Sequence, residues 1–294
     1  MAGTVAGKVV ICGVGLIGGS FALAIKSALA GRQCPRIVGM GRTRAPLEQA
    51  LKLGVIDEIA TDWANALQGA DLVLLGMPVG QMSAVMQALM PHLEPQTIVT
   101  DGGSTKSDVV AAARAAFGDR IGQFIPGHPI AGAEKSGVTA AKADLYIGKR
   151  VVLTPLTENA PEHVKALRTV WEICGAKVSE LAPVDHDRVF AAVSHLPHLL
   201  AFALVHDLAE RDNADQLFGF AASGFRDFTR IASSHPEMWR DICIANRNAL
   251  LKEVDAFMME LLKTRVLLAS ADSSGLEAMF AAARARRDAW LETL

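Results

Sequence analysis

The chain has 294 residues, which leaves room for about two domains at roughly 150 residues each. Hydrophobic residues make up 51% of the chain, slightly above the globular average of about 45–50%, so the composition predicts folded cores and excludes a disordered protein. A formal net charge of −2 argues against a general binder of nucleic acids or anionic membranes.

The first two-thirds of the chain alternates short apolar runs with amphipathic stretches. Runs rich in Val, Ile and Leu predict strands at 8–12, 36–40, 71–75, 97–101, 150–153 and 177–181. Helical periodicity between them predicts helices at 16–29, 79–89, 106–116 and 161–174. This alternation indicates a Rossmann-type, doubly wound α/β fold, in which a mostly parallel sheet carries helices on both faces.

Beyond Pro183 the strand-like runs stop, and helical patterns cover 185–210, 214–220, 235–266 and 275–294. In the first of these helices the apolar residues cover most of the circumference, so it must be buried on nearly all sides. One small domain offers too little surface to cover it. The sequence therefore predicts a dinucleotide-binding domain at 1–182 and a helical substrate-binding and dimerisation domain at 183–294, which forms a homodimer.

A glycine-rich segment follows the first predicted strand and opens the first predicted helix. Gly13, Gly15 and Gly18 form the pattern GxGxxG, with Leu16 and Ile17 between the last two glycines. In this context the first glycine makes a tight turn, the second lets the backbone approach a pyrophosphate, and the third lets helix and strand pack closely. A tight turn without a ligand is the alternative, and we predict a dinucleotide site.

The end of the second predicted strand indicates which dinucleotide is bound. NAD enzymes usually carry an acidic residue there, which binds the ribose 2′-hydroxyl. This chain has Gly41, Arg42 and Thr43 instead, and Arg42 suits a 2′-phosphate through charge-assisted hydrogen bonds. Solvated arginines in a loop are the alternative. We predict NADP as the preferred cofactor and NAD as the alternative, and we assign Met77 and Pro78 to the nicotinamide ribose.

Two further strand ends carry polar side chains. Ser104 lies in the segment GGSTK after the strand at 97–101, and His128 lies in the segment GHPIAG. Ligands of an open α/β sheet bind beyond the carboxyl ends of its strands, where a Ser and a His from neighbouring strands can share a hydrogen bond. His is the usual proton acceptor near neutral pH. Spacing alone favours this no more than a structural role, in which each residue caps a turn or a helix.

The helical half adds candidate residues for an anionic substrate. His195 and His198 lie in the segment SHLPH, and Arg226 and Arg230 lie in GFRDFTRIA. Such side chains among apolar residues either form a core ion pair or bind an anion between the domains, and we expect the second for Arg230. The run Asp-His-Asp at 185–187 could suggest metal ligands, but adjacent residues at a helix start cannot all point one way. It predicts a helix cap, and we predict no metal site.

Six motifs occur in a specific order: GVGLIGGS (13–20), DGGSTK (101–106), GHPIAGAEKSG (127–137), SHLPH (194–198), GFRDFTRIA (224–232) and MWRDI (238–242). Together they resemble the prephenate/arogenate (cyclohexadienyl) dehydrogenase family of tyrosine biosynthesis over about residues 8–290. The resemblance implies that His128 is the catalytic histidine, that Ser104 is its serine partner, and that Arg230 binds a substrate carboxylate. His195 and Arg226 match residues that line the family's substrate pocket.

The resemblance also implies the reaction. Prephenate carries a ring carboxylate, a 4-hydroxyl group and a pyruvyl side chain, which is alanyl in arogenate. Hydride leaves C4 for the nicotinamide, the hydroxyl proton is removed, and CO₂ departs as the ring becomes aromatic, giving 4-hydroxyphenylpyruvate or tyrosine. The residues fit this chemistry, because His128 can accept the proton, Ser104 can orient its ring, and Arg230 can neutralise the carboxylate.

The residues alone leave two other functions possible. A β-hydroxyacid-type NADP dehydrogenase also joins a Rossmann domain to helices, but it uses a helix-borne lysine as acid and base, and the chain has no well-placed counterpart. A non-catalytic NADPH-binding sensor would not need His128, Ser104 and Arg230 together. The sequence does not separate prephenate from arogenate as the substrate.

Cysteines and targeting segments bear on the cellular compartment. Cys12, Cys34, Cys174 and Cys243 lie far apart without a CxxC pair, which excludes a zinc ribbon or a disulfide-dense scaffold. The longest apolar run, 199–205, is far shorter than the roughly 18 residues of a membrane span, and the N-terminus shows no export signal. We expect a reduced, cytoplasmic enzyme that binds neither membranes nor nucleic acids.

Overall fold

The computed structural model describes residues 7–132 and 135–293. Ala133 and Glu134, within the segment GHPIAGAEKSG, lie outside the described residues. The chain divides into two compact units, one ending at Arg247 and one covering Asn248–Leu294. The first unit extends past the predicted boundary at 182/183, because side chains that follow this boundary form hydrogen bonds with the nucleotide-binding part.

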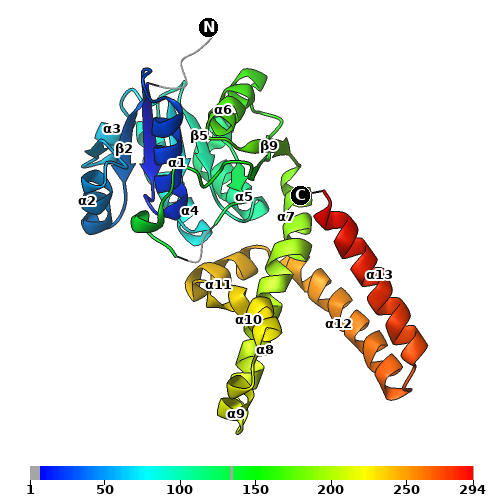
Figure 1. Cartoon of the computed structure of the whole chain (residues 1–294). Helices are drawn as coiled ribbons and strands as arrows, with labels where there is room; N and C mark the ends of the chain where they lie inside the picture. Colours follow the sequence, from blue (N-terminus) through cyan, green and yellow to red (C-terminus); the bar gives the residue numbers. More distant parts are fainter. Residues whose placement is uncertain (1–6, 133–134, 294) are drawn as a thin grey trace. The chain divides into compact units, whose positions relative to one another are not determined.

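Six parallel strands form the main sheet. They are β1 (Lys8–Cys12), β2 (Arg36–Met40), β3 (Glu58–Ile59), β4 (Leu72–Leu75), β5 (Ile98–Asp101) and β6 (Phe124–Ile125). Their order is β3-β2-β1-β4-β5-β6 (Figure 1), so the winding reverses between β1 and β4. This confirms the doubly wound fold that the sequence predicts, and it places ligand sites at the carboxyl ends of these strands.

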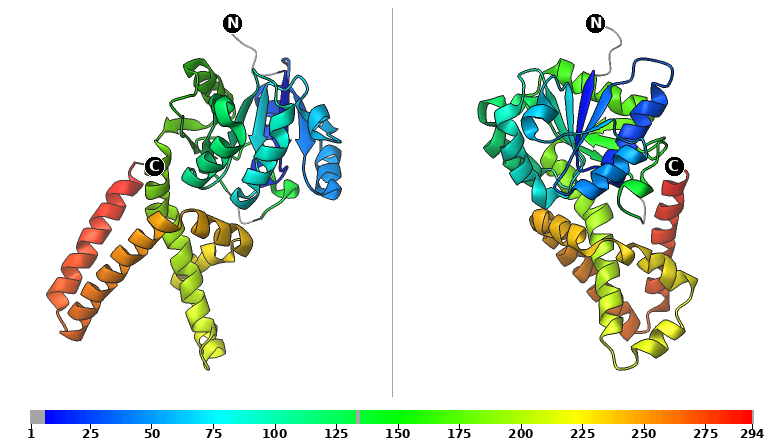
Figure 2. Two further views of the ribbon diagram at one scale, coloured as in Figure 1. Left: turned by 180° about the vertical axis from the view of Figure 1, so that it is seen from behind. Right: turned by 90° about the vertical axis from the view of Figure 1, so that its left-hand side faces the viewer.

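Each face of the sheet has its own core, because alternate residues of a strand point to opposite faces. Val9 and Ile11 belong to one cluster of buried side chains, and Val10 and Cys12 belong to the other. The first face is covered by α1 (Leu16–Ala28), α2 (Arg44–Lys52) and α6 (Pro161–Ile173), and the second by α3 (Trp63–Leu67), α4 (Val79–Leu89) and α5 (Ser107–Phe117) (Figure 2). Both faces are buried, which explains why the strands are largely apolar.

Three strands form a second, separate sheet: β7 (Gly127–Pro129), β8 (Arg150–Leu153) and β9 (Lys177–Glu180), in that order. The sequence pattern assigned β8 and β9 to the parallel sheet, and that assignment is wrong. Only Pro126 separates β6 from β7, and β7 pairs antiparallel with β8. Gly127 also donates a hydrogen bond to Asp101 at the end of β5, so β7 holds His128 beside the carboxyl edge of the main sheet.

A continuous helical segment, Pro183–Ala209, follows the second sheet. It consists of α7 (Pro183–Phe190), the π-helical turn η4 (Ala191–His195) and α8 (Leu196–Ala209). Val189 and Val193 are exposed, so the single chain does not bury this segment on nearly all sides as the sequence predicts. The helices that follow are α9 (Ala214–Gly219), α10 (Ser223–Thr229), the short turn η5 (Arg230–Ser233) and α11 (Pro236–Ala245).

The segment Pro183–Ala209 is also long and apolar enough, by length and composition, to cross a membrane. The sequence did not predict this, because uninterrupted apolar runs within it are short. Its first turns carry His186 and Asp187, which are buried. His186 forms a hydrogen bond with His128 of β7, and Asp187 forms one with the backbone at the start of α5. Such contacts are typical of a helix that belongs to a folded domain.

The second unit is a hairpin of α12 (Arg247–Ala269) and α13 (Ser273–Leu291), which lie side by side in both figures. Asp272 caps α13 by accepting a hydrogen bond from the Gly275 N–H at 2.9 Å. The sequence predicts one helix over 235–266, whereas the structure has α11 and α12, separated at Asn246. Large apolar side chains are exposed on the hairpin, among them Leu251, Met258, Met259, Leu261, Leu262, Val266, Leu268, Phe280 and Trp290.

Candidate active site

The three glycines of the GxGxxG segment have the geometry that a dinucleotide loop requires. Gly13 has φ +88°, and a Cβ there would lie 2.9 Å from the backbone nitrogen of Met77. A Cβ on Gly18 would lie 2.5 Å from the Gly13 carbonyl oxygen, so α1 can pack on β1 only with glycine at this position. A Cβ on Gly15 would meet nothing within 4 Å, which leaves space for a phosphate to approach the backbone.

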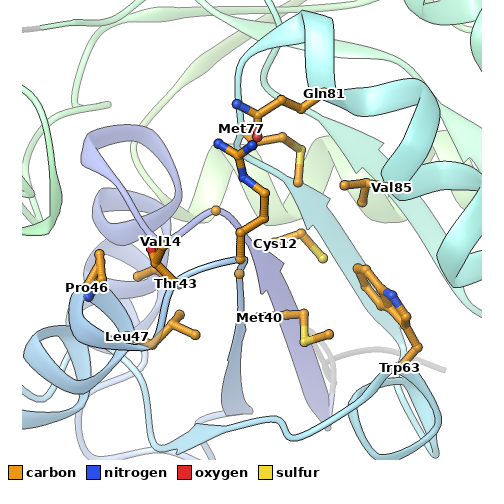
Figure 3. A pocket seen from close by; sticks show the side chains of 13 residues that line it. Cys12, Val14, Met40, Thr43, Pro46, Leu47, Trp63, Met77, Gln81 and Val85 are labelled. Carbon is orange, nitrogen blue, oxygen red and sulfur yellow. The ribbon is translucent and has the colours of Figure 1, made fainter.

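A cavity of about 320 Å³ opens beyond the carboxyl ends of β1 and β2 (Figure 3). Its volume is at the lower end of the range for small-molecule sites, about 300–1,000 Å³. Five predicted cofactor residues line it, namely Gly13, Gly41, Arg42, Thr43 and Met77. The other five predicted cofactor residues, Gly15, Leu16, Ile17, Gly18 and Pro78, do not line it.

Sequence reasoning missed the apolar lining of this cavity. Figure 3 places Met40, Cys12 and Trp63 around it, with Gln81 and Val85 on the side of α4. Trp63 begins α3, a helix too short to give a periodic signal. Burial raises the pKa of Cys12 to about 12, so its thiol stays neutral.

A second group of polar side chains gathers where β5, β7 and α7 meet. His128 Nδ1 lies 2.9 Å from His186 Nε2, and His186 Nδ1 lies 2.9 Å from Asp187 Oδ1. His186 has no exposed surface and Asp187 is 5% exposed, whereas His128 is half-buried. The three side chains form a hydrogen-bonded row from a partly accessible histidine to a buried carboxylate.

The carboxylate of Asp187 also binds the start of α5. Its Oδ1 accepts a hydrogen bond from the Lys106 N–H, and its Oδ2 accepts one from the Ser107 N–H, both at 2.8 Å. Burial alone would raise the pKa of Asp187, but the hydrogen bonds from His186, Ser107 and Lys106 hold it below its usual value. The carboxylate is therefore ionised at neutral pH.

A fully buried ion pair lies next to this row. Lys106 Nζ donates to Asp101 Oδ2 and, at 2.8 Å, to the carbonyl of Gly127. The Asp101 carboxylate in turn accepts from the N–H groups of Gly127 at 3.0 Å and Gly103 at 2.8 Å. Burial raises the pKa of Asp101, against the opposing attraction of Lys106. The pair joins the end of β5 to β7 and so fixes the backbone at His128.

The surroundings of His128 keep its ring neutral. Burial lowers its pKa well below the usual value, and His186, Lys106 and His195 lower it further. Ser104 lies in the loop between β5 and α5, and no hydrogen bond joins it to His128 within the described residues. His186 already occupies Nδ1, so a bond from Ser104 would have to reach Nε2. The orienting role of Ser104 stays a prediction.

His195 lies in the π-helical turn η4 and is 1% exposed. Its Nδ1 lies 3.1 Å from the side-chain nitrogen of Asn246, which also donates to the Asp187 carbonyl at 2.8 Å. Burial lowers the pKa of His195 to about 4, and the carbonyl of Ser104 opposes this without forming a hydrogen bond of normal geometry. His195 Nε2 is thus a buried ring nitrogen that makes no hydrogen bond within the described residues.

The predicted arginines lie in different surroundings. His198 stacks on Trp239 with ring centroids 3.7 Å apart, and burial lowers its pKa, with a further contribution from the nearby charge of Arg230. His195 also faces Trp239, at 6.1 Å between ring centroids. The structure therefore brings Arg230 and the two histidines of SHLPH into one region. Both arginines are exposed, and the side chain of Arg226 is 79% exposed.

The dinucleotide loop and His128 are neighbours. A Cβ on Gly102, at the end of β5, would lie 3.1 Å from Ile17 of the loop and 3.7 Å from Pro129, the residue after His128. The carboxyl edge of the sheet thus places a nucleotide site beside a neutral histidine. This arrangement suits a reaction that couples hydride transfer to proton removal.

Sequence reasoning missed the roles of His186 and Asp187. It predicts that the run 185–187 caps its own helix, whereas α7 has Ala182 at its N-cap position without a side-chain cap. Asp187 instead caps α5, which starts 80 residues earlier in the chain. No local pattern signals a contact over that separation. Within the described residues, no group of three or more His, Cys, Asp or Glu side chains could hold a metal ion.

Two family models match the chain. The nucleotide-binding domain of prephenate dehydrogenase matches residues 21–180, and the dimerization domain of prephenate dehydrogenase matches residues 182–282. The chain is 39% identical to prephenate dehydrogenase of Bacillus subtilis over 95% of this chain and 75% of the relative. It is 34% identical to cyclohexadienyl dehydrogenase of Zymomonas mobilis over 93% of this chain and 92% of the relative.

Solved structures agree with these matches. Prephenate dehydrogenase of Aquifex aeolicus, in complex with hydroxyphenyl propionate and NAD⁺, superposes with a TM-score of 0.89 at 36% identity over 98% of this chain and 99% of that one. Synechocystis arogenate dehydrogenase superposes with a TM-score of 0.81 at 30% identity over 96% and 99% of the two chains. The chain therefore belongs to the prephenate/arogenate (cyclohexadienyl) dehydrogenase family, the NAD(P)-dependent dehydrogenases of tyrosine biosynthesis.

Proposed function

We propose that this chain oxidises prephenate, arogenate or both at the edge formed by β5, β7 and α7, with NADP as the preferred hydride acceptor. The observation that carries the proposal is a neutral, half-buried histidine, His128, held beside a dinucleotide loop. A β-hydroxyacid-type dehydrogenase would need a free lysine as acid and base. Lys106 precedes α5 but is fully buried in its pair with Asp101, so it does not offer one.

His128 is the proton acceptor in this proposal. A bound nicotinamide would supply the hydride acceptor, and the neutral imidazole takes the proton of the 4-hydroxyl group as the ring is oxidised. A base whose pKa lies below neutral is unprotonated before the reaction, which the step requires. We assign Ser104, from the adjoining loop, to the same hydroxyl end of the substrate as the partner of His128.

Arg230 binds the ring carboxylate in this proposal, with His195 and Arg226 as further substrate-binding residues. The charge of Arg230 acts on His198, which places the guanidinium near the SHLPH segment. His195 is neutral with Nδ1 facing the Asn246 amide, so its Nε2 carries the ring hydrogen and can donate to a substrate oxygen. The assignment of Arg226 rests on the motif alone.

The residues around the 320 Å³ cavity fit a dinucleotide with a 2′-phosphate. Gly15 leaves the backbone open to a pyrophosphate, and Arg42, just after β2, provides the positive charge. We further propose that residues 1–182 bind the nucleotide and that residues 183–294 bind the substrate and form a homodimer. We also propose that this biosynthetic enzyme is cytoplasmic.

The decisive experiment supplies prephenate, arogenate and 3-hydroxyisobutyrate in separate assays and follows NADPH formation. We expect turnover with prephenate, arogenate or both, and none with 3-hydroxyisobutyrate. Turnover with 3-hydroxyisobutyrate alone would assign the chain to the β-hydroxyacid class. Nucleotide binding without turnover of any of the three would make it a sensor.

Arg230→Ala tests the carboxylate site. Arg230 is exposed in this structure, and in the proposal the bound substrate buries its guanidinium. Truncating one partner of a buried charge pair costs about 2–5 kcal/mol, so KM for the substrate should rise at least about tenfold. Arg211→Ala is the control, because Arg211 has a 52% exposed side chain that pairs with Asp207 on the surface, and its loss should leave KM unchanged. An unchanged KM in Arg230→Ala would assign Arg230 a structural role.

A further inference from the structure

We propose that His186 and Asp187 act on the reaction through His128: the row Asp187–His186–His128 holds His128 in the tautomer with an unprotonated Nε2, and so makes Nε2 the atom that accepts the substrate proton. The inference rests on the proposed role of His128 as the proton acceptor. His186 and Asp187 are positioning residues, because they contact the base rather than the reacting atoms.

A count of the ring hydrogens leads to this tautomer. Asp187 is ionised and can only accept, so the 2.9 Å contact requires His186 Nδ1 to carry a hydrogen. Burial lowers the pKa of His186 despite the opposing effect of Asp187, so His186 is neutral and has one ring hydrogen. Its Nε2 must then accept, and His128 Nδ1 must donate across 2.9 Å. Neutral His128 is left with a lone pair on Nε2.

Packing keeps the row in place. The ring of Phe190 lies 4.5 Å from that of His186 and 4.9 Å from that of His128, measured between centroids, and the two histidine rings are 5.1 Å apart. Asp187 cannot rotate freely, because its two oxygens also bind the backbone N–H groups that start α5. The same carboxylate therefore sets both the start of a helix and the tautomer of the base.

The charges around His128 fit proton uptake at Nε2. The substrate O–H bond breaks, its proton goes to Nε2, and its electron pair forms the new carbonyl bond as hydride leaves C4. His186 and Asp187 face the resulting imidazolium from α7, where Asp187 supplies a negative charge. Lys106 opposes it from the β5–α5 segment but is paired with Asp101. His195, from η4, is neutral at pH 7.

Substitutions of His186 test the row by kinetics. His186→Phe keeps an aromatic ring against Phe190 but removes the acceptor for His128 Nδ1, and we expect kcat to fall at least about tenfold while KM stays within about twofold. His186→Gln keeps an acceptor oxygen and should recover part of kcat. A purely structural residue would instead affect both variants alike. Wild-type kcat in His186→Phe would overturn the proposal.

Nitrogen NMR of histidine-labelled protein tests the tautomer without using activity. At pH 7 we expect His128 to have a protonated Nδ1 and an unprotonated Nε2, with the signal identified through its loss in His128→Asn. Asp187→Asn should convert part or all of His128 to the other tautomer. Asp185→Asn is the matched control, because Asp185 has a 57% exposed side chain and pairs with Arg188 on the surface.

Two outcomes separate this inference from the proposed function. A protonated Nε2 on His128 in the wild-type protein would overturn the row, whatever the kinetics. Normal turnover in His128→Asn would instead overturn the role of His128 as the proton acceptor, while the tautomer could still be read from the wild-type spectrum.

Discussion

His128→Asn separates the two nitrogens of the predicted base. An asparagine amide can replace Nδ1 as a donor to His186, but it has no counterpart of Nε2. The variant should therefore fold and bind NADP normally, and kcat should fall by about 10²–10⁴, the usual worth of a general base. Steady-state kinetics with a nucleotide titration as the control would check this. A loss below about tenfold would remove His128 from the proton transfer.

We expect the nucleotide preference to depend on Gly41 and Arg42, which follow β2. Arg42 can make one or two charge-assisted bonds to a 2′-phosphate, each worth about 1.5–3 kcal/mol, and about 1.4 kcal/mol is tenfold in affinity. We therefore expect NADP to exceed NAD by at least about tenfold in kcat/KM. Gly41→Asp with Arg42→Ala should reverse the order, because the new carboxylate binds the 2′-hydroxyl and repels the phosphate.

Position 41 can accept this change. A Cβ on Gly41 would make only an ordinary contact of 3.8 Å with Leu47, so the backbone there has room for a side chain. Arg42→Ala alone serves as the control, since it should weaken NADP without improving NAD. Equal kcat/KM of the unmodified enzyme with both nucleotides would show that Arg42 points into solvent.

The candidate site was predictable where a residue's chemistry is visible within a short motif. Gly13 and His128 belong to such motifs, GVGLIGGS and GHPIAG. Asp187 was not predictable, because its function depends on hydrogen bonds to a helix start 80 residues earlier in the chain. Lys106 was also missed, because a lysine at a helix start is expected in solvent, whereas here it has no exposed surface.

At the level of elements, the strands of the main sheet were predictable because both faces of the sheet are buried. The pattern could not show which sheet each strand joins. β8 is apolar like β4, yet it pairs antiparallel with β7, a strand of three residues that gives no periodic signal. Strand pairing depends on contacts between residues that are distant in sequence, and local hydrophobic periodicity carries no information about such contacts.

The exposed apolar side chains of α12 and α13 predict a subunit interface. The matching dimerization-domain model covers both helices in large part, and two-fold homodimers are the commonest oligomers. We expect light scattering at micromolar concentration to give about twice the 31.2 kDa of one chain. A particle of the single-chain mass would refute the dimer.

Two neighbouring positions on α12 test where the interface lies. Leu262 is 53% exposed, and Leu262→Glu should shift the dimer toward monomers, because it would bury a charge without a partner. Lys263→Glu is the matched control, since this side chain is 69% exposed and pairs only with Glu260 one turn away. Equal dimer stability in both variants would place the interface elsewhere.

At the scale of the whole molecule, histidines with lowered pKa values make stability depend on pH. His128, His186 and His195 are all neutral in the folded protein, because burial disfavours their charged forms. In the unfolded chain they bind protons near their usual pKa of 6.5. Asp101 acts in the opposite direction through its raised pKa, so the effect of one histidine is best isolated by substitution.

His195 gives the clearest prediction. Between its unfolded pKa of 6.5 and its folded value of about 4, the unfolded chain binds the additional proton, so the free energy of unfolding falls as the pH drops through this window. One fully responding group contributes at most about 1.4 kcal/mol per pH unit, which gives about 1–2 kcal/mol for His195 between neutral pH and pH 5. Asp187 does not add to this slope, because a carboxylate with a lowered pKa loses its contribution only at more acidic pH.

Urea unfolding of the wild type at pH 5, 6 and 7, at one protein concentration, should therefore give lower stability at pH 5. His195→Gln replaces a buried ring, so it should be less stable at pH 7. Because glutamine cannot take up a proton, the variant should lose less of its stability on acidification. His206→Gln, at an exposed position, is the control for the substitution itself. A slope in His195→Gln equal to that of the wild type would mean that His195 titrates alike in the folded and unfolded chains, and that its buried nitrogen is open to water.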